Sequence, residues 1–105
     1  MTYQDAINAL SDPTRRAIID HLRSGALSVS AIAAQMPISR PAVSQHLRVL
    51  SDAGLLTVTP AGNRRLYAIA PEGVQQLRQY LDSLWDDALA AFARAAQEKA
   101  KGQTE

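Results

Sequence analysis

One stretch of the chain, SRPAVSQHLRVL at residues 39–50, carries the side chains best suited to chemistry. Val43, Leu47 and Leu50 recur at the i, i+4, i+7 spacing of one buried helical face. The face between them lacks the Glu and Lys that are typical of an exposed helix. It carries small, hydroxyl, amide and guanidinium side chains instead: Pro41, Ser44, Gln45 and Arg48. These hydrogen-bonding groups suit phosphate oxygens and the edges of nucleic-acid bases.

The charge of the chain is unevenly distributed, although its net value is only +1. Residues 1–70 hold seven arginines and four acids, a net charge of +3, whereas residues 71–105 hold four basic and six acidic side chains, a net charge of −2. Every basic residue of the first segment is Arg, which is well shaped for bidentate contact with phosphate or guanine. The first 70 residues are therefore the part that we expect to face a polyanion. Chance placement of solvated charges is the alternative.

Composition limits the class of protein. A length of 105 residues, 47% of them hydrophobic and 20% charged, indicates a single globular domain. No apolar run approaches the roughly 18–20 residues of a membrane span, so we expect a cytoplasmic location with no membrane partner. The absence of cysteine excludes disulfides and thiolate chemistry. Two scattered histidines, His21 and His46, and no Gly-rich phosphate loop predict no metal site, no cofactor and no enzyme activity.

Three short helices are predicted before the quoted stretch. The first spans residues 3–10, the second begins at Pro13 behind the N-cap Asp12 and ends near Gly25, and the third spans about 29–36. Their predicted inward residues are Tyr3, Ile7, Leu10, Ile18, Ile19, Leu22, Val29, Ile32 and Ala33. Only residues 37–39 separate the third helix from the next.

The quoted stretch is predicted to be the fourth helix, with clear signals at both ends. Ser39 is a natural N-cap, and Pro41 lies in the first turn, where its missing N–H breaks no bond. Gly54 is placed to end the helix in a left-handed conformation, with Leu55 folded back on the last turn. Two short helices joined by a tight turn predict a helix-turn-helix.

A hairpin is predicted directly after this motif. LLTVT at 55–59 and RRLYAIA at 64–70 are rich in β-branched and aromatic residues, and PAGN between them is turn chemistry. Arg64 and Arg65 then lie just beyond the hairpin tip, where they are predicted to contact phosphate or the minor groove. An exposed tip that is charged only for solubility is the alternative. A helix-turn-helix followed by a basic hairpin predicts a winged helix.

The last helix, predicted over 71–100, carries a long apolar stripe. Its members alternate by three and four residues: Val74, Leu77, Leu81, Leu84, Ala88 and Phe92, widened by Trp85, Leu89 and Ala96. Because the winged helix already supplies a core, the stripe predicts a two-fold dimer in which this helix meets its mate and the first helix, through Ile7 and Leu10. Packing within one chain is the alternative. Residues 101–105 are expected to fray.

Three segments resemble the ArsR family of small bacterial repressors: LSDPTRRAIIDHL, LSVSAIAAQMPISRPAVSQHLRVLSDAGLL and GNRRLYAI. The similarity covers roughly residues 5–95, and the run from Ser44 to Leu55 is specific for this group. It implies a mainly α fold with a small β-hairpin, a homodimer and a pseudo-palindromic operator, often in the protein's own promoter. The expected single domain at 1–105 divides into dimerisation helices at 1–10 and 71–100 and a DNA-binding core at 12–70.

The resemblance places one set of residues at or near DNA: Ser39, Arg40, Ser44, Gln45, His46 and Arg48. Pro41 of the same helix, and Asn63, Arg64 and Arg65 of the wing, complete the predicted interface. Gln45 can pair with adenine, and Arg48 with guanine or phosphate. His46 is predicted either to pack at the edge of the apolar face or to contact phosphate. Arg15 and Arg16 oppose the dipole at the start of their helix, so we expect a specific partner, either DNA phosphate or a carboxylate across the dimer.

The sequence differs from the metal-sensing members of the ArsR family, which it resembles. Those proteins carry two cysteines flanking a valine where this chain has Ser28, Val29 and Ser30. A second family site pairs Asp with His on the last helix, which here offers Asp82, Asp86 and Asp87 but no histidine. We therefore predict no response to metals; an unidentified small-molecule or protein effector stays open. A winged-helix module that binds proteins, with weak affinity for DNA, is the alternative function.

Overall fold

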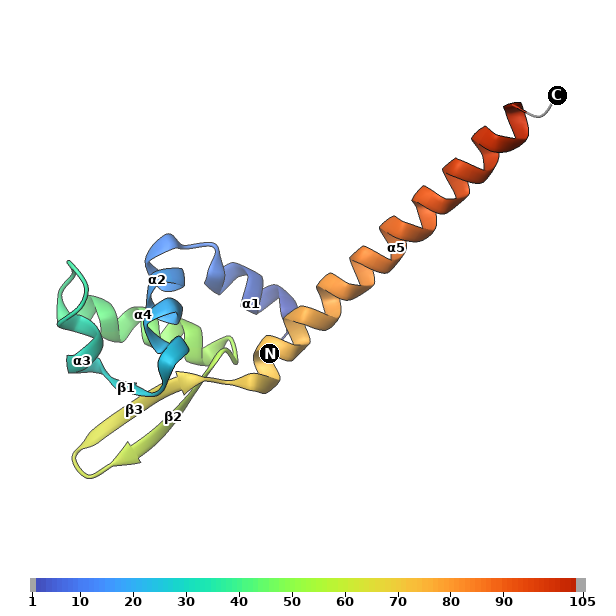
Figure 1. Ribbon diagram of the computed structural model, residues 1–105. Helices are drawn as coiled ribbons and strands as arrows, with labels where there is room; N and C mark the ends of the chain where they lie inside the picture. Colours follow the sequence, from blue (N-terminus) through green and yellow to red (C-terminus); the bar gives the residue numbers. More distant parts are fainter. Residues whose placement is uncertain (1, 104–105) are drawn as a thin grey trace.

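The computed structural model describes residues 2–103, which form helices and one small sheet. The order of elements is α1 (Tyr3–Leu10), α2 (Pro13–His21), the 3-10 turn η1 (Leu22–Ser24), β1 (Leu27–Ser28), α3 (Val29–Ala33), α4 (Arg40–Asp52), β2 (Leu56–Ala61), β3 (Arg64–Ile69) and α5 (Pro71–Gln103). Figure 1 shows a small helical body, a hairpin on one side of it, and α5 extending away. The predicted five helices and hairpin are confirmed.

Two helices end earlier than the sequence predicted. α2 stops at His21 and continues only as the tighter turn η1, and α3 stops at Ala33 rather than near Met36. After α3 the chain keeps turning through short-range bonds, because the amides of Gln35 and Met36 donate to carbonyls three residues back, at 3.0 and 3.3 Å. Such bonds commonly tighten the last turn of a helix.

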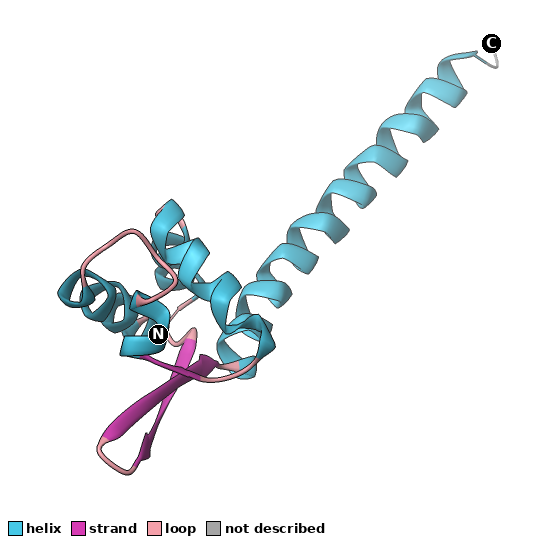
Figure 2. Ribbon diagram, turned by 60° about the vertical axis from the view of Figure 1, so that its left-hand side comes forward, coloured by secondary structure: helices cyan, strands magenta, loops and turns pink. Residues whose placement is uncertain are grey.

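The sheet has three strands in the order β1-β3-β2, all antiparallel. β1 was not predicted as a strand, but Leu27 pairs with Tyr67 and Ser28 with Leu66. This pairing attaches the start of α3 to the hairpin. Figure 2 shows β2 and β3 as a two-stranded arm that projects from the helices. The arm is the wing that the sequence predicted.

The turn of the wing is shorter than predicted. β2 runs through Pro60 to Ala61, so that Gly62 and Asn63 alone connect the strands. Proline is tolerated there because β2 is an edge strand, where a missing N–H leaves no ladder bond unmade. Gly62 has a φ of 65°, a left-handed conformation at the first turn position that suits glycine.

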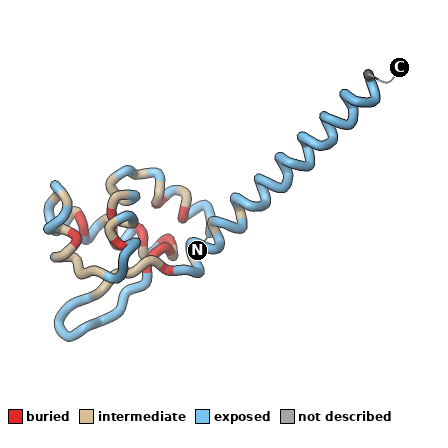
Figure 3. Tube along the Cα trace, viewed as in Figure 1, coloured by how far each residue is buried: buried red, intermediate tan, exposed pale blue. Residues whose placement is uncertain are grey.

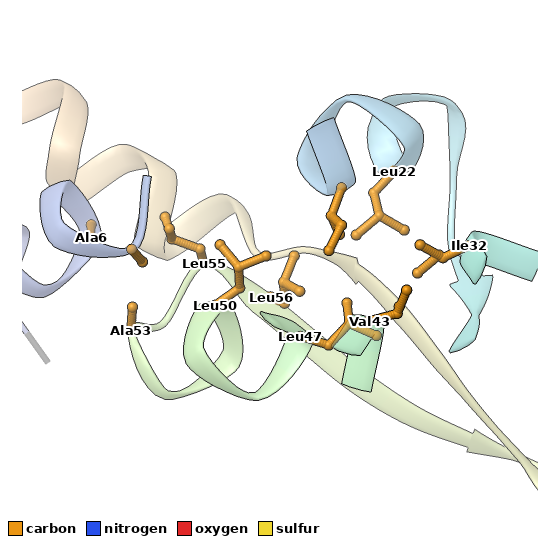
Figure 4. Close-up of a cluster of buried hydrophobic side chains, with 11 residues drawn as sticks. Ala6, Leu22, Ile32, Val43, Leu47, Leu50, Ala53, Leu55 and Leu56 are labelled. Carbon is orange, nitrogen blue, oxygen red and sulfur yellow. The ribbon is translucent and has the colours of Figure 1, made fainter. Parts of the chain in front are cut away.

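The core of the body lies between α4 and the elements around it (Figure 4). Its fully buried side chains come from α2, α3, α4 and the segment after α4: Ile18, Ile32, Val43, Leu47, Leu50 and Leu55. Ile19, Val29 and Ala33, which were predicted to point inward, are half-buried at its edge. Removing such a fully buried Leu or Ile side chain costs about 2–5 kcal/mol of stability. This core therefore holds α4 firmly from behind.

The prediction that Tyr3 and Ile7 lie on the buried face of α1 is wrong. Ala6 and Ala9 face the core, whereas Tyr3 is 44% exposed and Ile7 is only half-buried. Small alanine side chains let α1 pack closely against the body, which a helix with a larger buried stripe could not do. The Tyr3 ring stacks instead on Tyr80 of α5, with 4.1 Å between ring centroids.

The start of α5 is fixed against the end of α4. The Ala70 amide donates to the Leu55 carbonyl at 2.8 Å. A Cβ at Gly73 would overlap the carbonyl oxygen of Gly54, so only glycine fits this approach of two backbones. The direction of α5 is therefore tied to the helix that carries the candidate site.

Beyond its first turns α5 leaves the body. Every side chain that the structure describes from Leu81 onward is exposed, and the molecule measures 74 × 25 × 22 Å (Figure 3). The helix continues to Gln103, past the point at which fraying was predicted, and residues 104–105 lie outside the described residues. Seven alanines between 88 and 100 give this segment a high intrinsic helix propensity.

Candidate DNA interface

The exposed face of α4 is the centre of the candidate site. Val43, Leu47 and Leu50 are fully buried, which turns the opposite face of the helix to solvent. That face carries the exposed side chains predicted from the sequence: Arg40, Pro41, Ser44, Gln45 and Arg48. Its groups can donate to phosphate or pair with base edges, and no core contact restrains them.

Both ends of α4 have the predicted caps. Ser39 precedes the helix with an extended backbone, and its Oγ accepts a bond from the Ala42 amide at 3.2 Å. At the other end the Leu55 amide donates to the Leu50 carbonyl, and the Gly54 amide to the Ser51 carbonyl, each at 3.0 Å. Gly54 has a φ of 79°. This pair of bonds is a Schellman motif, and it fixes where the polar face ends.

The fold brings this face together with the wing. A surface hollow of about 600 Å³ between α4 and the hairpin is lined by Val29, Ser44, Arg48, Ser51, Val58, Arg65 and Tyr67. Ser44 and Arg48 of α4 therefore lie beside Arg65, 17 or more residues away in the chain. Asn63 and Arg64 lie with Arg40 in a neighbouring hollow. Ser51 Oγ is buried beneath without a hydrogen-bond partner among the described residues.

The arginines of this surface are available to a ligand. Arg48 pairs with Asp52 at 3.9 Å, but both side chains are highly exposed and such a pair is weak. In the part of the chain that the structure describes, Arg40, Arg64 and Arg65 form no ion pair. The surface between α4 and the wing is therefore positively charged, and few carboxylates pair with its arginines.

Arg15 and Arg16 have partners that the sequence did not suggest. Arg15 donates through Nε to the Ala9 carbonyl and through Nη2 to the Asn8 carbonyl, and Arg16 donates through Nη1 to the Leu10 carbonyl at 2.8 Å. Both cations thus bind the last carbonyls of α1, where the helix dipole favours positive charge. These contacts give both arginines partners within the chain at the start of α2. DNA contact by either residue stays a prediction.

Asp12 is the cap of α2 and stays ionised. Its carboxylate accepts bonds from the Arg15 amide at 3.2 Å and the Thr14 amide at 2.7 Å. The bond from Arg15, together with that from Thr14 and the nearby charges of Arg15 and His46, lowers the pKa of Asp12 below its ordinary value. His46 is half-buried beside this cap, and the choice between packing and phosphate contact remains a prediction.

The predicted dimer residues form an exposed apolar face on α5. Leu81 is 53% exposed, Trp85 64% and Phe92 74%. The other members are Val74, Leu84, Leu89 and Ala88, also exposed, and Leu77, Ile7 and Leu10, which are half-buried. The alternative that one chain buries this stripe by itself is wrong for the described residues. Sequence reasoning missed Tyr80, whose stacking on Tyr3 joins α1 to α5.

The positions of the family's sensor residues have other contacts here. Ser28 caps α3, since its Oγ accepts a bond from the Ala31 amide at 3.2 Å. Asp82 pairs with Arg78 at 3.8 Å on the surface of α5. Within residues 2–103 no three His, Cys, Asp or Glu side chains are grouped as metal ligands, and no helix there has the length and apolarity that a membrane span needs.

The sequence is similar to known regulators over most of its length. A family model described as a helix-turn-helix domain matches residues 10–59. The HTH-type transcriptional regulator Rv2034 of Mycobacterium tuberculosis is 49% identical over 89 residues, which cover 85% of this chain and 83% of that protein. The arsenical resistance operon repressor of Staphylococcus xylosus is 32% identical over 85 residues, or 78% of this chain and 82% of that protein.

Solved structures show the same fold. An ArsR-like transcriptional regulator from Rhodococcus sp. RHA1 superposes with a TM-score of 0.76 at 30% identity, over 90% of this chain and 92% of that one. The homodimeric winged helix-turn-helix DNA-binding domain of Mb0332 from Mycobacterium bovis, a possible ArsR-family regulator, gives 0.65 at 30% identity, over 80% and 78%. With the capped recognition helix and the basic wing, these similarities show that the chain belongs to the ArsR family of winged helix-turn-helix, DNA-binding transcriptional regulators.

Proposed function

We propose that the protein is a homodimeric repressor that binds a pseudo-palindromic operator in double-stranded DNA. One observation carries this proposal: α5 presents a continuous exposed apolar face and is joined rigidly to the body that holds α4. The body has a closed core of its own, so the face on α5 is free for a second chain. The same connection would make the spacing of two α4 helices depend on how two α5 helices pack.

A dimer is supported by the size of the exposed side chains. Leu81, Trp85 and Phe92 are each more than half exposed. Monomeric proteins rarely leave so large a contiguous apolar patch in water. Its spacing by threes and fours matches helix–helix packing. In a two-fold dimer the two recognition helices would enter successive major grooves about 34–36 Å apart.

The roles that we propose divide the interface between specificity and affinity. Gln45 reads adenine, and Arg48 reads guanine or binds phosphate, because their exposed side chains have the matching donors and acceptors. Ser39 and the first amides of α4 bind a phosphate at the helix start. Ser44 and Pro41 are small enough to allow close approach to the groove. Asn63, Arg64 and Arg65 bind the backbone or minor groove beside it.

We propose that DNA binding is the whole activity, with no catalysis and no cofactor. The protein would act in the bacterial cytoplasm, where its operator lies. Repression would follow when the protein occupies an operator that lies within a promoter. Neither Ser28 nor Ser30 offers a soft ligand, so release by metals is not part of this proposal. A small-molecule or protein effector would have to act on the dimer or the interface instead.

The experiment is selection of bound sequences from random double-stranded DNA, followed by affinity measurements at several salt concentrations. We expect an inverted repeat with half-sites one helical turn apart. We also expect a steep fall of affinity with salt, because each phosphate contact releases counterions. A single unrepeated half-site would contradict the dimer. Weak binding without sequence preference would favour the protein-interaction module.

A further inference from the structure

A surface hollow of about 230 Å³ lies where the end of α4 and the start of β2 meet the start of α5. Two of its lining residues, Gly54 and Gly73, are the glycines whose close backbone approach ties α5 to α4. Its polar lining residues are Ser51, Thr57, Glu72 and Gln76. We call it the joint hollow, because it lies between the helix that carries the candidate DNA interface and the helix that carries the exposed apolar face.

The polar side chains of the joint hollow are available to a ligand. Ser51 also borders the hollow beside the wing, and its Oγ is buried without a hydrogen-bond partner among the described residues. The side chains of Thr57, Glu72 and Gln76 make no hydrogen bond or ion pair with another described residue. A buried hydroxyl normally has a partner, either in the protein or in a molecule bound to it. The joint therefore offers donors and acceptors that its own chain leaves unused.

The charge of the joint hollow is negative. The Glu72 carboxylate lines it, and no basic side chain of the described residues does. Glu72 lies in the first turn of α5, where the helix dipole favours an acid. The carbonyl groups at the end of α4 add partial negative charge on the opposite wall. A cation that also forms hydrogen bonds therefore suits this hollow.

Size and donor set favour an organic cation over a metal ion. Calcium and magnesium need about six or more oxygen ligands at about 2.0–2.6 Å, and a single carboxylate among the described residues lines this hollow. Its volume of about 230 Å³ equals roughly seven or eight waters, at about 30 Å³ each. A small amine with hydroxyl groups matches that space. Its ammonium group would donate to Glu72, and its hydroxyl groups would bond the neutral side chains of the lining.

We infer that the joint hollow binds a small hydroxylated primary amine, whose ammonium group pairs with Glu72 and whose hydroxyl groups bond Ser51 and Gln76. A ligand held by α4 and α5 together biases the angle between these two helices. That angle sets the spacing of two α4 helices in a dimer. Binding of the amine and of the operator are therefore coupled, and this coupling rests on the proposed function.

The first test is an NMR titration of the DNA-free protein with tris(hydroxymethyl)aminomethane at neutral pH, where this amine is protonated. We expect saturable shifts at the amides of Thr57, Gly73 and Gln76. Pentaerythritol has the same shape, with a hydroxymethyl group in place of the ammonium group, and should bind about tenfold or more weakly because it lacks the charge.

Glu72→Gln should weaken binding of the amine to the same extent, since it removes the carboxylate and keeps the shape of the side chain. Glu98→Gln is the matched control, because Glu98 is exposed on the same helix and lies outside the lining. Shifts that do not saturate, that persist in Glu72→Gln, or that pentaerythritol produces equally well would overturn the inference.

The second test measures the coupling on an operator obtained by selection. A saturating concentration of the amine should change the affinity of wild type for the operator by about fivefold or more, and should leave that of Glu72→Gln unchanged. Both are measured at one ionic strength, because affinity for DNA falls with salt. Equal affinity of wild type with and without the amine would overturn the coupling. If wild type selects no operator, the proposed function fails, and the titration of the DNA-free protein alone decides on the site.

Discussion

The body and the outer half of α5 use apolar side chains in opposite ways. In the body, Ile18, Leu47 and Leu55 are fully buried, and the polar residues lie outside. In α5, Leu81, Trp85 and Phe92 have comparable size and are more than half exposed. The body buries its own large apolar side chains, and the outer half of α5 does not. A chain that keeps large apolar side chains in register along a helix, without burying them, is built for a contact with another surface.

The difference also separates two properties of the protein. Stability of the winged helix depends on the body, whose core is complete without α5 beyond its first turns. In the proposed dimer, assembly depends on α5, whose outer half is exposed along the described residues. A change in one region should therefore leave the other largely intact.

The largest effect is expected from a charge on the apolar face of α5. Leu81→Asp would bury a carboxylate in the proposed dimer contact, at a cost of several kcal/mol unless the helices part. Sedimentation should then show a monomer, and operator binding should collapse, while circular dichroism keeps the wild-type helix content. Gln97→Asp adds the same charge to the opposite face of α5 and should remain dimeric. A dimeric Leu81→Asp that binds its operator normally would point to another interface.

A smaller effect on stability is expected where the two regions join. Gly73→Ala would place a Cβ against the Gly54 carbonyl, which is backbone and cannot turn aside. Overpacking of this kind costs about 1–3 kcal/mol. Thermal or urea unfolding should show the loss. Gly102→Ala is the control in the same helix, since nothing lies within 4 Å of a Cβ there. Equal stability of the two variants would mean that α5 does not meet the body as described.

Within the DNA-binding body, specificity and affinity should separate by residue. Gln45→Ala should relax base preference in one part of each half-site, at about 1–3 kcal/mol. Arg64→Ala should weaken binding to all sequences alike and reduce the salt slope by about one unit. Sequence selection and salt titration with each variant measure the two effects. An unchanged base preference in Gln45→Ala would contradict the placement of α4 in the groove.

No effect is expected from metal ions. A transition-metal sensor needs converging thiolate, imidazole or carboxylate ligands, and Ser28 and Ser30 replace the thiolates. Zinc, cadmium, copper and arsenite should leave the protein–operator complex intact in a fluorescence titration against a chelator-treated control. Stoichiometric release of DNA at micromolar metal would contradict this, and would direct attention to Asp82, Asp86 and Asp87.

The features that the sequence predicted well are set by neighbours in the chain. Ser39 caps α4 and Gly54 ends it because capping depends on bonds within a few residues. The wing followed from alternation and a glycine turn. In the candidate site, the exposed face of α4 followed from Val43, Leu47 and Leu50, which fix the side of the helix that is buried.

The features that the sequence did not predict depend on packing between distant segments. The pairing of β1 with β3 could not be read from two residues, and Gly73 gave no sign of its contact with Gly54. Arg15 and Arg16 oppose the helix dipole at the start of α2, which indicated a specific partner. Only the fold places the end of α1 beside them. The hollow that brings Arg40 together with Asn63 and Arg64 was not predicted, because its arginines and serines come from three separate parts of the chain.

The most direct test of the account is the mass of the wild-type chain in solution without DNA. Sedimentation equilibrium at micromolar concentration should give twice the chain mass of 11.3 kDa. That result is expected because the apolar face of α5 is exposed among the described residues. A stable monomer that still binds an inverted repeat with high affinity would contradict the claim that α5 assembles the DNA-binding dimer.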